Sequence, residues 1–188
     1  MHYSAIKKAD IANGFGVRVS LFVSGCTRHC KNCFNQETWD FNHGDEFTDE
    51  VVDDIINELK HDWYNGLTIL GGEPMEPQNQ KAVLDFILKV RKELPEEKTI
   101  WLYTGNVLEK DILKENGRAH TEYSDDILRN IDILIDGPFI EEKKDISLLY
   151  RGSSNQRVID ARRTMEYGYT CCVKLYNDGR VAEFKEDK

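Results

Sequence analysis

The sequence lacks the hydrophobic segments that mark membrane and secreted proteins. No apolar run approaches the roughly 20 residues that a helix needs to span a bilayer, and residues 1–10 contain no apolar core of a signal peptide. Without a secretory signal, thiols are expected to stay reduced. We therefore expect a soluble, cytoplasmic protein with no membrane partner.

Basic residues are also scarce relative to acidic ones. The 188 residues include 25 Lys and Arg against 34 Asp and Glu, which gives a net charge of −9. Phosphate binding needs a basic face, so this balance argues against a nucleic-acid partner. A small molecule or another protein is the expected partner.

The chain has no internal repeat, low-complexity tract or linker. Its length predicts one domain, residues 1–188, that is large enough to bury a core without disulfides. The five cysteines are odd in number, which also argues against a disulfide framework. Only Cys171 and Cys172 lie outside the segment 24–35, so the sequence has no second cysteine cluster.

Three cysteines lie within the twelve residues 24–35, as Cys26, Cys30 and Cys33, with the spacing C-x3-C-x2-C. This spacing lets three thiolates converge on one metal centre, and thiolates favour iron–sulfur clusters, zinc or Cu(I). A structural zinc site has four protein ligands, and an ordinary 4Fe–4S carrier uses four cysteines. Three ligands leave one position open for a group that is not protein. His29 could complete a Cys3His zinc site, although it lies between two of the cysteines, where joint coordination is geometrically awkward. Spacing alone therefore does not decide between an iron–sulfur cluster and zinc.

Hydrophobic patterns predict alternating strands and helices. Strands are expected at residues 17–23, 67–70, 99–103, 131–135 and 170–176, with a turn at 177–179. Helices are expected at 48–60, where Thr48 is the N-cap, and around 83–90, with shorter helical stretches at 108–114 and 125–129. This order implies an α/β fold with parallel strands and right-handed crossovers.

Four polar or glycine-rich motifs each follow the carboxyl end of a predicted strand. They are the cysteine segment, Gly71-Gly72-Glu73-Pro74, Thr104-Gly105 and Asp136-Gly137. The carboxyl edge of a parallel sheet is where α/β proteins build their sites. The sequence therefore predicts an active site at this edge.

These motifs resemble those of a known superfamily. C-x3-C-x2-C after the first strand, followed by Gly-Gly-Glu-Pro after the next, resembles the radical S-adenosylmethionine (SAM) superfamily. Asn35, Thr38 and Trp39 are similar to an Asn-x-x-Thr-Trp motif in activases of glycyl-radical enzymes. The segments 136–139 and 148–157 resemble those of activases of anaerobic ribonucleoside-triphosphate reductases. The resemblance covers residues 14–158, and the segment 159–188 lies outside it.

The resemblance implies a fold and a chemistry. The fold would be a partial, open (β/α) barrel with fewer than eight units. Cys26, Cys30 and Cys33 would hold a 4Fe–4S cluster whose fourth iron takes the amino and carboxylate groups of SAM. The reduced cluster would cleave SAM to methionine and a 5′-deoxyadenosyl radical, which would remove a hydrogen atom from a glycine of the reductase. The expected partners are that reductase and a flavodoxin-like electron donor.

Further residues take expected roles from the same resemblance. Gly71 and Gly72 would let the backbone approach the methionine moiety, and Glu73 would accept a hydrogen bond from its ammonium group. The remaining candidates are Thr104 and Asp136 for ribose or methionine, Arg151 or Arg157 for the carboxylate or the reductase, and Asn35 for orienting the cysteine loop.

Each assignment has a plainer alternative. Gly-Gly-Glu can form an ordinary turn, Asp136 can cap a helix or turn, and Asn35 can stabilise a turn. The two arginines can form surface ion pairs, and Trp39 can pack beneath the loop. Adjacent residues of a strand face opposite sides, so Cys171 and Cys172 are expected to be free thiols.

Two alternative functions also remain at this stage. The chain could activate another glycyl-radical enzyme of the formate-lyase type. It could also be a non-catalytic interaction protein that holds zinc or an iron–sulfur cluster.

Overall fold

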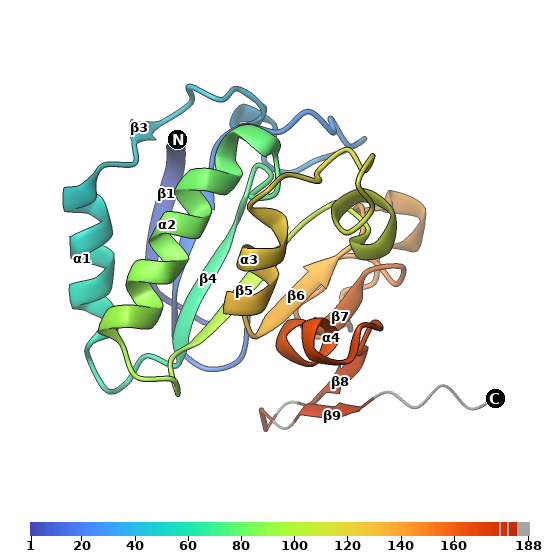
Figure 1. Ribbon diagram of the computed structural model, residues 1–188. Helices are drawn as coiled ribbons and strands as arrows, with labels where there is room; N and C mark the ends of the chain where they lie inside the picture. The colour runs from blue at the N-terminus through green and yellow to red at the C-terminus, as the bar shows by residue number, and fades with distance from the viewer. Residues whose placement is uncertain (177, 180, 184–188) are drawn as a thin grey trace.

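A seven-stranded mixed sheet forms the centre of the protein in a computed structural model that describes residues 1–176, 178–179 and 181–183 (Figure 1). The strand order is β3-β1-β2-β4-β5-β6-β7, and the sheet is open. Its strands are β1 (His2–Asp10), β2 (Arg18–Val23), β3 (Asp45–Glu46), β4 (Gly66–Gly71), β5 (Thr99–Tyr103), β6 (Ile133–Asp136) and β7 (Arg157–Asp160). A separate antiparallel hairpin consists of β8 (Val173–Leu175) and β9 (Val181–Glu183).

The helices lie on one face of this sheet (Figure 1). They are α1 (Asp49–Leu59), α2 (Pro77–Glu93), α3 (Ser124–Asn130) and α4 (Ala161–Tyr167), with single turns η1 (Gln36–Trp39), η2 (Leu108–Ile112) and η3 (Glu141–Lys143). Thr48 is the N-cap of α1, as predicted. Within the described residues, no helix is both long enough and apolar enough to cross a membrane.

The predicted parallel arrangement is confirmed for the centre of the sheet and wrong at its margins. β2, β4, β5 and β6 run parallel, whereas β1, β3 and β7 pair antiparallel. The strand expected at 170–176 is shorter and pairs with β9 instead of joining the sheet. Asn177 of the expected turn lies outside the described residues.

Two groups of apolar side chains cover the two faces of the sheet. The larger group joins the inner sides of the helices to one sheet face, with Leu21, Ile69 and Leu102 fully buried in it. The smaller group lies on the opposite face, where Trp101 and Ile135 pack with side chains from the segments that follow β1 and β6 and from β8. Because both faces are covered, all six residues of β2 are buried.

The parallel strands bring their carboxyl ends to one edge of the sheet. Backbone hydrogen bonds continue past the strands there: Gly72 N donates to Val23 O at 2.7 Å, and Thr104 N donates to Ile135 O at 2.8 Å. The four motifs that follow the strands therefore start from a shared, hydrogen-bonded edge.

A buried arginine joins the opposite, amino ends of the strands. Arg18, the first residue of β2, is 1% exposed, and its guanidinium lies over the Trp101 ring. It donates five hydrogen bonds, to Thr68 Oγ1, Thr99 Oγ1 and the main-chain oxygens of residues 15, 67 and 99. Burial lowers the pKa of Arg18 to about 10. The five bonds use all five guanidinium donors.

We expect Arg18→Lys to lower the free energy of unfolding by about 3 kcal/mol. The lysine has three donors on one nitrogen and leaves buried acceptors without partners. Urea unfolding followed by circular dichroism measures the change. Arg129→Lys, at an exposed position of α3, is the matched control and should stay within about 0.5 kcal/mol of the parent protein. An equal loss in both variants would contradict this account of Arg18.

Candidate functional site

A cavity of about 410 Å³ lies at the carboxyl edge of the parallel strands. Tyr103 lies at its base, and Phe139, Leu148 and Tyr150 line it from the segment between β6 and β7. It also brings together most of the residues predicted from the sequence: Cys26, Cys30, Cys33, Gly71, Gly72, Glu73, Thr104 and Arg151.

The cysteine loop enters this cavity directly from β2. Cys26 is 8% exposed, whereas Cys30 and Cys33 are half-buried. Burial raises the pKa of the Cys26 thiol to about 11. His29 and Asn32 have left-handed backbone conformations, with φ of 47° and 58°, which turn the chain on either side of Cys30.

The three thiols share a cavity without forming a closed ligand set. Among the described residues, no group of three or more His, Cys, Asp or Glu side chains is placed to hold a metal ion. His29, the alternative fourth ligand, stacks on Trp39 with 4.4 Å between ring centroids and does not line the cavity. Trp39 thus contacts a side chain of the loop and also lines the cavity, and its packing beneath the loop stays a prediction. All five cysteines lie within the described residues and none forms a disulfide, and neither Cys171 nor Cys172 lines the cavity.

The chemistry of these residues fits an iron–sulfur cluster with an anionic ligand beside it. The cavity offers three soft sulfur donors, as a cluster requires. Several nitrogen donors near it are buried without a hydrogen-bond partner: Arg28 Nε, Asn35 Nδ2 and Arg151 Nε. Unused donors of this kind suit thiolates, sulfide or a carboxylate, all of which accept hydrogen bonds.

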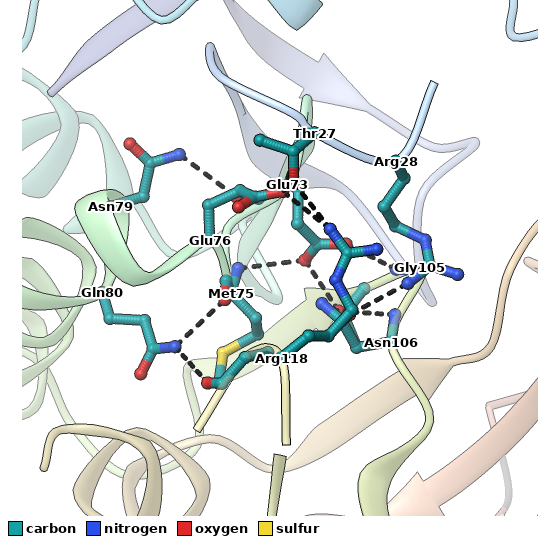
Figure 2. A network of polar contacts seen from close by, with 12 residues as sticks. Thr27, Arg28, Glu73, Met75, Glu76, Asn79, Gln80, Gly105, Asn106 and Arg118 are labelled. Carbon is teal, nitrogen blue, oxygen red and sulfur yellow. Dashed lines mark hydrogen bonds and ion pairs between the residues drawn. The ribbon is translucent and has the colours of Figure 1, made fainter. Parts of the chain in front are cut away.

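Glu73 links the ends of β4 and β5 (Figure 2). Its carboxylate is 1% exposed and accepts hydrogen bonds from Thr104 Oγ1 at 2.7 Å, Met75 N at 3.0 Å and Gly105 N at 2.8 Å. Burial raises the pKa of Glu73, while these three hydrogen bonds and the charge of Arg28 oppose the rise. Oε2 accepts only the Gly105 bond, so it has capacity for another donor.

Gly71 and Gly72 allow the end of β4 to approach the end of β2 and the cysteine loop that follows it. A Cβ on Gly71, whose φ is +111°, would lie 2.6 Å from Val23 N. A Cβ on Gly72 would lie 2.8 Å from Gly25 O and 2.9 Å from Thr38 O. The structure therefore gives these glycines a packing role within the chain, while their predicted contact with a ligand stays a prediction.

Residues at the amino end of α2 form hydrogen bonds with the cysteine loop (Figure 2). Glu76 Oε1 accepts hydrogen bonds from Thr27 N at 2.8 Å and Thr27 Oγ1 at 2.7 Å. Asn79 Nδ2 donates to Ser24 O and Glu73 O. Arg118 donates to Thr27 Oγ1 at 2.6 Å and lies 3.5 Å from Glu76.

Sequence analysis missed these supporting residues, and it also missed Arg28 and Asn106. Glu76 and Asn79 follow the Gly-Gly-Glu-Pro motif at the start of a helix, which is the one local signal that could have identified them. Arg118 has no comparable signal, because it reaches the loop from 91 residues away.

Asp136 lies outside the cavity lining, unlike the other strand-end motifs. Its buried carboxylate accepts hydrogen bonds from Leu108 N at 2.9 Å and from Arg157 Nε at 2.9 Å. Arg157 also donates two hydrogen bonds to Glu109. Asp136 thus caps the start of η2, and the predicted contact of this residue with a ligand stays a prediction.

Arg151 and Asn35 keep free polar atoms for other contacts. Arg151 lines the cavity, and its Nη1 donates to Gln156 O at 2.9 Å. The main-chain oxygen of Asn35 accepts hydrogen bonds from Thr38 N and Thr38 Oγ1, which forms the turn that the plainer alternative predicts.

We expect Gly72→Ala to weaken retention of a cluster by roughly tenfold or more, because the added methyl group would displace the cysteine loop. Iron and sulfide content per chain after anaerobic reconstitution, together with visible absorption, measures this change. Gly168→Ala is the matched control. Gly168 ends α4 with φ +73° and has open space around it, so alanine there should cost about 1 kcal/mol of stability without affecting the cluster. Equal cluster content in both variants would rule out the packing role of Gly72.

The ion pair of Glu109 predicts a pH-dependent stability. The hydrogen bond from Arg157 lowers the pKa of Glu109 to about 2, from 4.5 for the free side chain, and Thr170 adds to this effect. The folded protein therefore binds fewer protons here than the unfolded chain, and the stabilisation is complete above about pH 5 and lost as pH falls towards 2. We expect the difference in free energy of unfolding between the parent protein and Glu109→Gln to narrow as urea titrations move from pH 6 to pH 3. A difference independent of pH would contradict this assignment.

Comparison with known proteins places the chain in a family. The family described as a 4Fe-4S single cluster domain matches residues 12–159, close to the range 14–158 predicted from motifs. An anaerobic ribonucleoside-triphosphate reductase-activating protein of Haemophilus influenzae is 44% identical over 158 residues, 83% of this chain and 96% of the relative. Proteins of the same name are 40% identical in Escherichia coli K12 (84% of this chain, 97% of the relative) and 37% identical in Enterobacteria phage T4 (84% and 93%). The chain therefore belongs to the family of anaerobic ribonucleoside-triphosphate reductase-activating proteins, with its 4Fe–4S domain.

Proposed function

We propose that this protein is a radical SAM enzyme that installs a glycyl radical on an anaerobic ribonucleoside-triphosphate reductase. Cys26, Cys30 and Cys33 hold a 4Fe–4S cluster, and one iron remains open for SAM. The observation that carries this proposal is that the three thiols share one cavity with the Gly-Gly-Glu segment. When bound, the reduced cluster and SAM supply a 5′-deoxyadenosyl radical.

The residues of the cavity bind and orient the ligand in this proposal. Glu73 is held rigidly by its three donors and has one oxygen with remaining capacity, which suits an ammonium group. Thr104 lies beside it and contacts the ribose or methionine moiety. Asn35 orients the cysteine loop, Arg151 pairs with a carboxylate of the reductase, and Asp136 contributes to ligand binding at the same sheet edge.

The open sheet corresponds to a partial (β/α) barrel with fewer than eight units. Its cavity opens beside Phe34, which is 88% exposed. A glycine-bearing loop of the reductase enters through this opening, and the docked reductase covers the apolar rim. Docking also excludes water from a reactive radical.

The partner assignments follow from the family and from the cavity. The relatives described above are named as activators of the reductase, which favours it over a lyase of the formate-lyase type. The match to a 4Fe–4S domain argues against the alternative that the chain is a non-catalytic interaction protein that holds zinc. The electron donor is a flavodoxin-like protein, and five cysteines without a disulfide among the described residues suit the cytoplasm.

The protein reconstituted with iron and sulfide should form 5′-deoxyadenosine from SAM under anaerobic conditions with a strong reductant. Cys30→Ala should abolish both the cluster and the product, because two thiolates cannot replace the three-cysteine set. Cys171→Ala, at a position that does not line the cavity, is the matched control and should retain both.

The reductase is then added to test the partner. A glycyl radical detected by electron paramagnetic resonance on the reductase, dependent on SAM and on Cys30, is the expected outcome. Protein with a full cluster that forms no 5′-deoxyadenosine even with the reductase present would overturn the proposed function. Loss of the cluster in both cysteine variants would overturn the ligand assignment.

A further inference from the structure

The guanidinium group of Arg28 lies in the cavity with donors to spare. Arg28 stands between Cys26 and Cys30 in the sequence, and its side chain lines the same cavity as their thiols. Nη1 donates to Asn106 Oδ1 at 2.9 Å, whereas Nε is buried and has no hydrogen-bond partner. Nη2 makes no hydrogen bond within the described residues and is not among the buried atoms, so the guanidinium keeps N–H donors for an acceptor of the ligand.

A chain of hydrogen bonds connects Arg28 with Glu73. Asn106 is fixed by two bonds to Thr104 Oγ1, from its main-chain N at 3.0 Å and from Nδ2 at 3.1 Å. Thr104 Oγ1 in turn donates to Glu73 Oε1 at 2.7 Å. Figure 2 shows Arg28, Asn106 and Glu73 around the end of β5. The guanidinium is therefore positioned by the same network that holds the carboxylate.

Gly105 separates the two opposite charges. A Cβ at this position would lie 2.6 Å from Arg28 Nε and 2.7 Å from Arg28 Cδ, so the guanidinium rests in the space that a side chain would fill. On its other side, Gly105 N donates to Glu73 Oε2 at 2.8 Å. A fixed cation and a fixed anion thus flank one glycine at the wall of the cavity.

We propose that Arg28 binds the carboxylate of the α-amino acid end of the ligand, whose ammonium group is accepted by Glu73. The carboxylate and ammonium groups of an α-amino acid are attached to the same carbon. Their binding partners, a cation and an anion, therefore have to lie side by side in the protein. A guanidinium suits a carboxylate because its planar N–H groups can donate in parallel. This inference rests on the proposed function, in which the ligand is SAM.

Arg151 is the competing candidate for this role. It also lines the cavity and has a buried Nε without a partner. It belongs to the segment between β6 and β7, however, and donates to Gln156 O. Among the described contacts, none joins Arg151 to the network of Glu73, whereas Arg28 is joined to it through Asn106 and Thr104.

Binding of two ligands to the cluster-containing protein tests the assignment. The first probe is S-adenosylhomocysteine, a thioether that lacks the sulfonium group of SAM and is therefore not cleaved reductively. The second probe is the same molecule without its carboxylate. Dissociation constants are measured by anaerobic equilibrium dialysis. Arg28→Gln should weaken binding of S-adenosylhomocysteine about 10- to 100-fold and change binding of the decarboxylated probe less than about twofold. Arg28→Lys, which keeps the charge but not the planar donors, should fall between the parent protein and Arg28→Gln.

Arg129→Gln, at an exposed position of α3, is the matched control and should keep both parent dissociation constants. Arg151→Gln removes the competing candidate and should keep the parent ratio of the two constants. Iron and sulfide content is measured for every variant, and the ratio of the two constants corrects for any general damage to the cavity. Equal weakening of both probes by Arg28→Gln, or loss of selectivity in Arg151→Gln instead, would overturn the inference alone. A parent protein with a full cluster that binds neither probe and forms no 5′-deoxyadenosine would overturn the proposed function as well.

Discussion

The site depends on one buried carboxylate at the end of β4. The side chain of Glu73 accepts hydrogen bonds from the end of β5, while its main-chain N–H donates to Gly25 O in the cysteine loop at 2.9 Å. A buried charge is costly unless it is hydrogen-bonded, so the surrounding donors have to stay in place. One residue therefore fixes the relative positions of two strand ends and the loop that bears the thiols.

The sequence predicted the centre of the sheet well because parallel strands buried on both faces appear as apolar runs. β4, β5 and β6 follow this pattern, and their positions were predicted within a few residues. β1 was missed because Lys7 and Lys8 interrupt its apolar pattern, which suits a strand near the sheet margin. α4 was missed because only two of its seven residues are buried, which leaves no extended apolar face.

The sequence predicted which residues would lie at the same edge of the sheet, but it did not predict the hydrogen-bond partners of their side chains. The cysteines, Gly72, Glu73 and Thr104 were expected to lie together and do line one cavity, because strand order alone brings them to one edge. Asp136 follows the same rule of position, but its carboxylate bonds to Arg157 and η2 instead. Contacts such as that between Arg28 and Asn106 join residues 78 positions apart, and local sequence patterns carry no information about them.

The margins of the open sheet have a consequence for how this protein associates with others. An unpaired strand edge is a template for pairing with strands of other chains. Here one margin is β3, which has only two residues, and the other is β7, whose outer side meets the segment at Cys171 and Cys172 through the bond from Asp160 N to Cys171 O. β3 pairs only with His2 and Tyr3, so the rest of the outer edge of β1 has no strand beside it within the described residues. Lys7 and Lys8 are exposed on this strand, and charged side chains on an edge strand hinder its pairing with other chains. These two lysines therefore disfavour self-association by sheet extension, although the sheet never closes on itself.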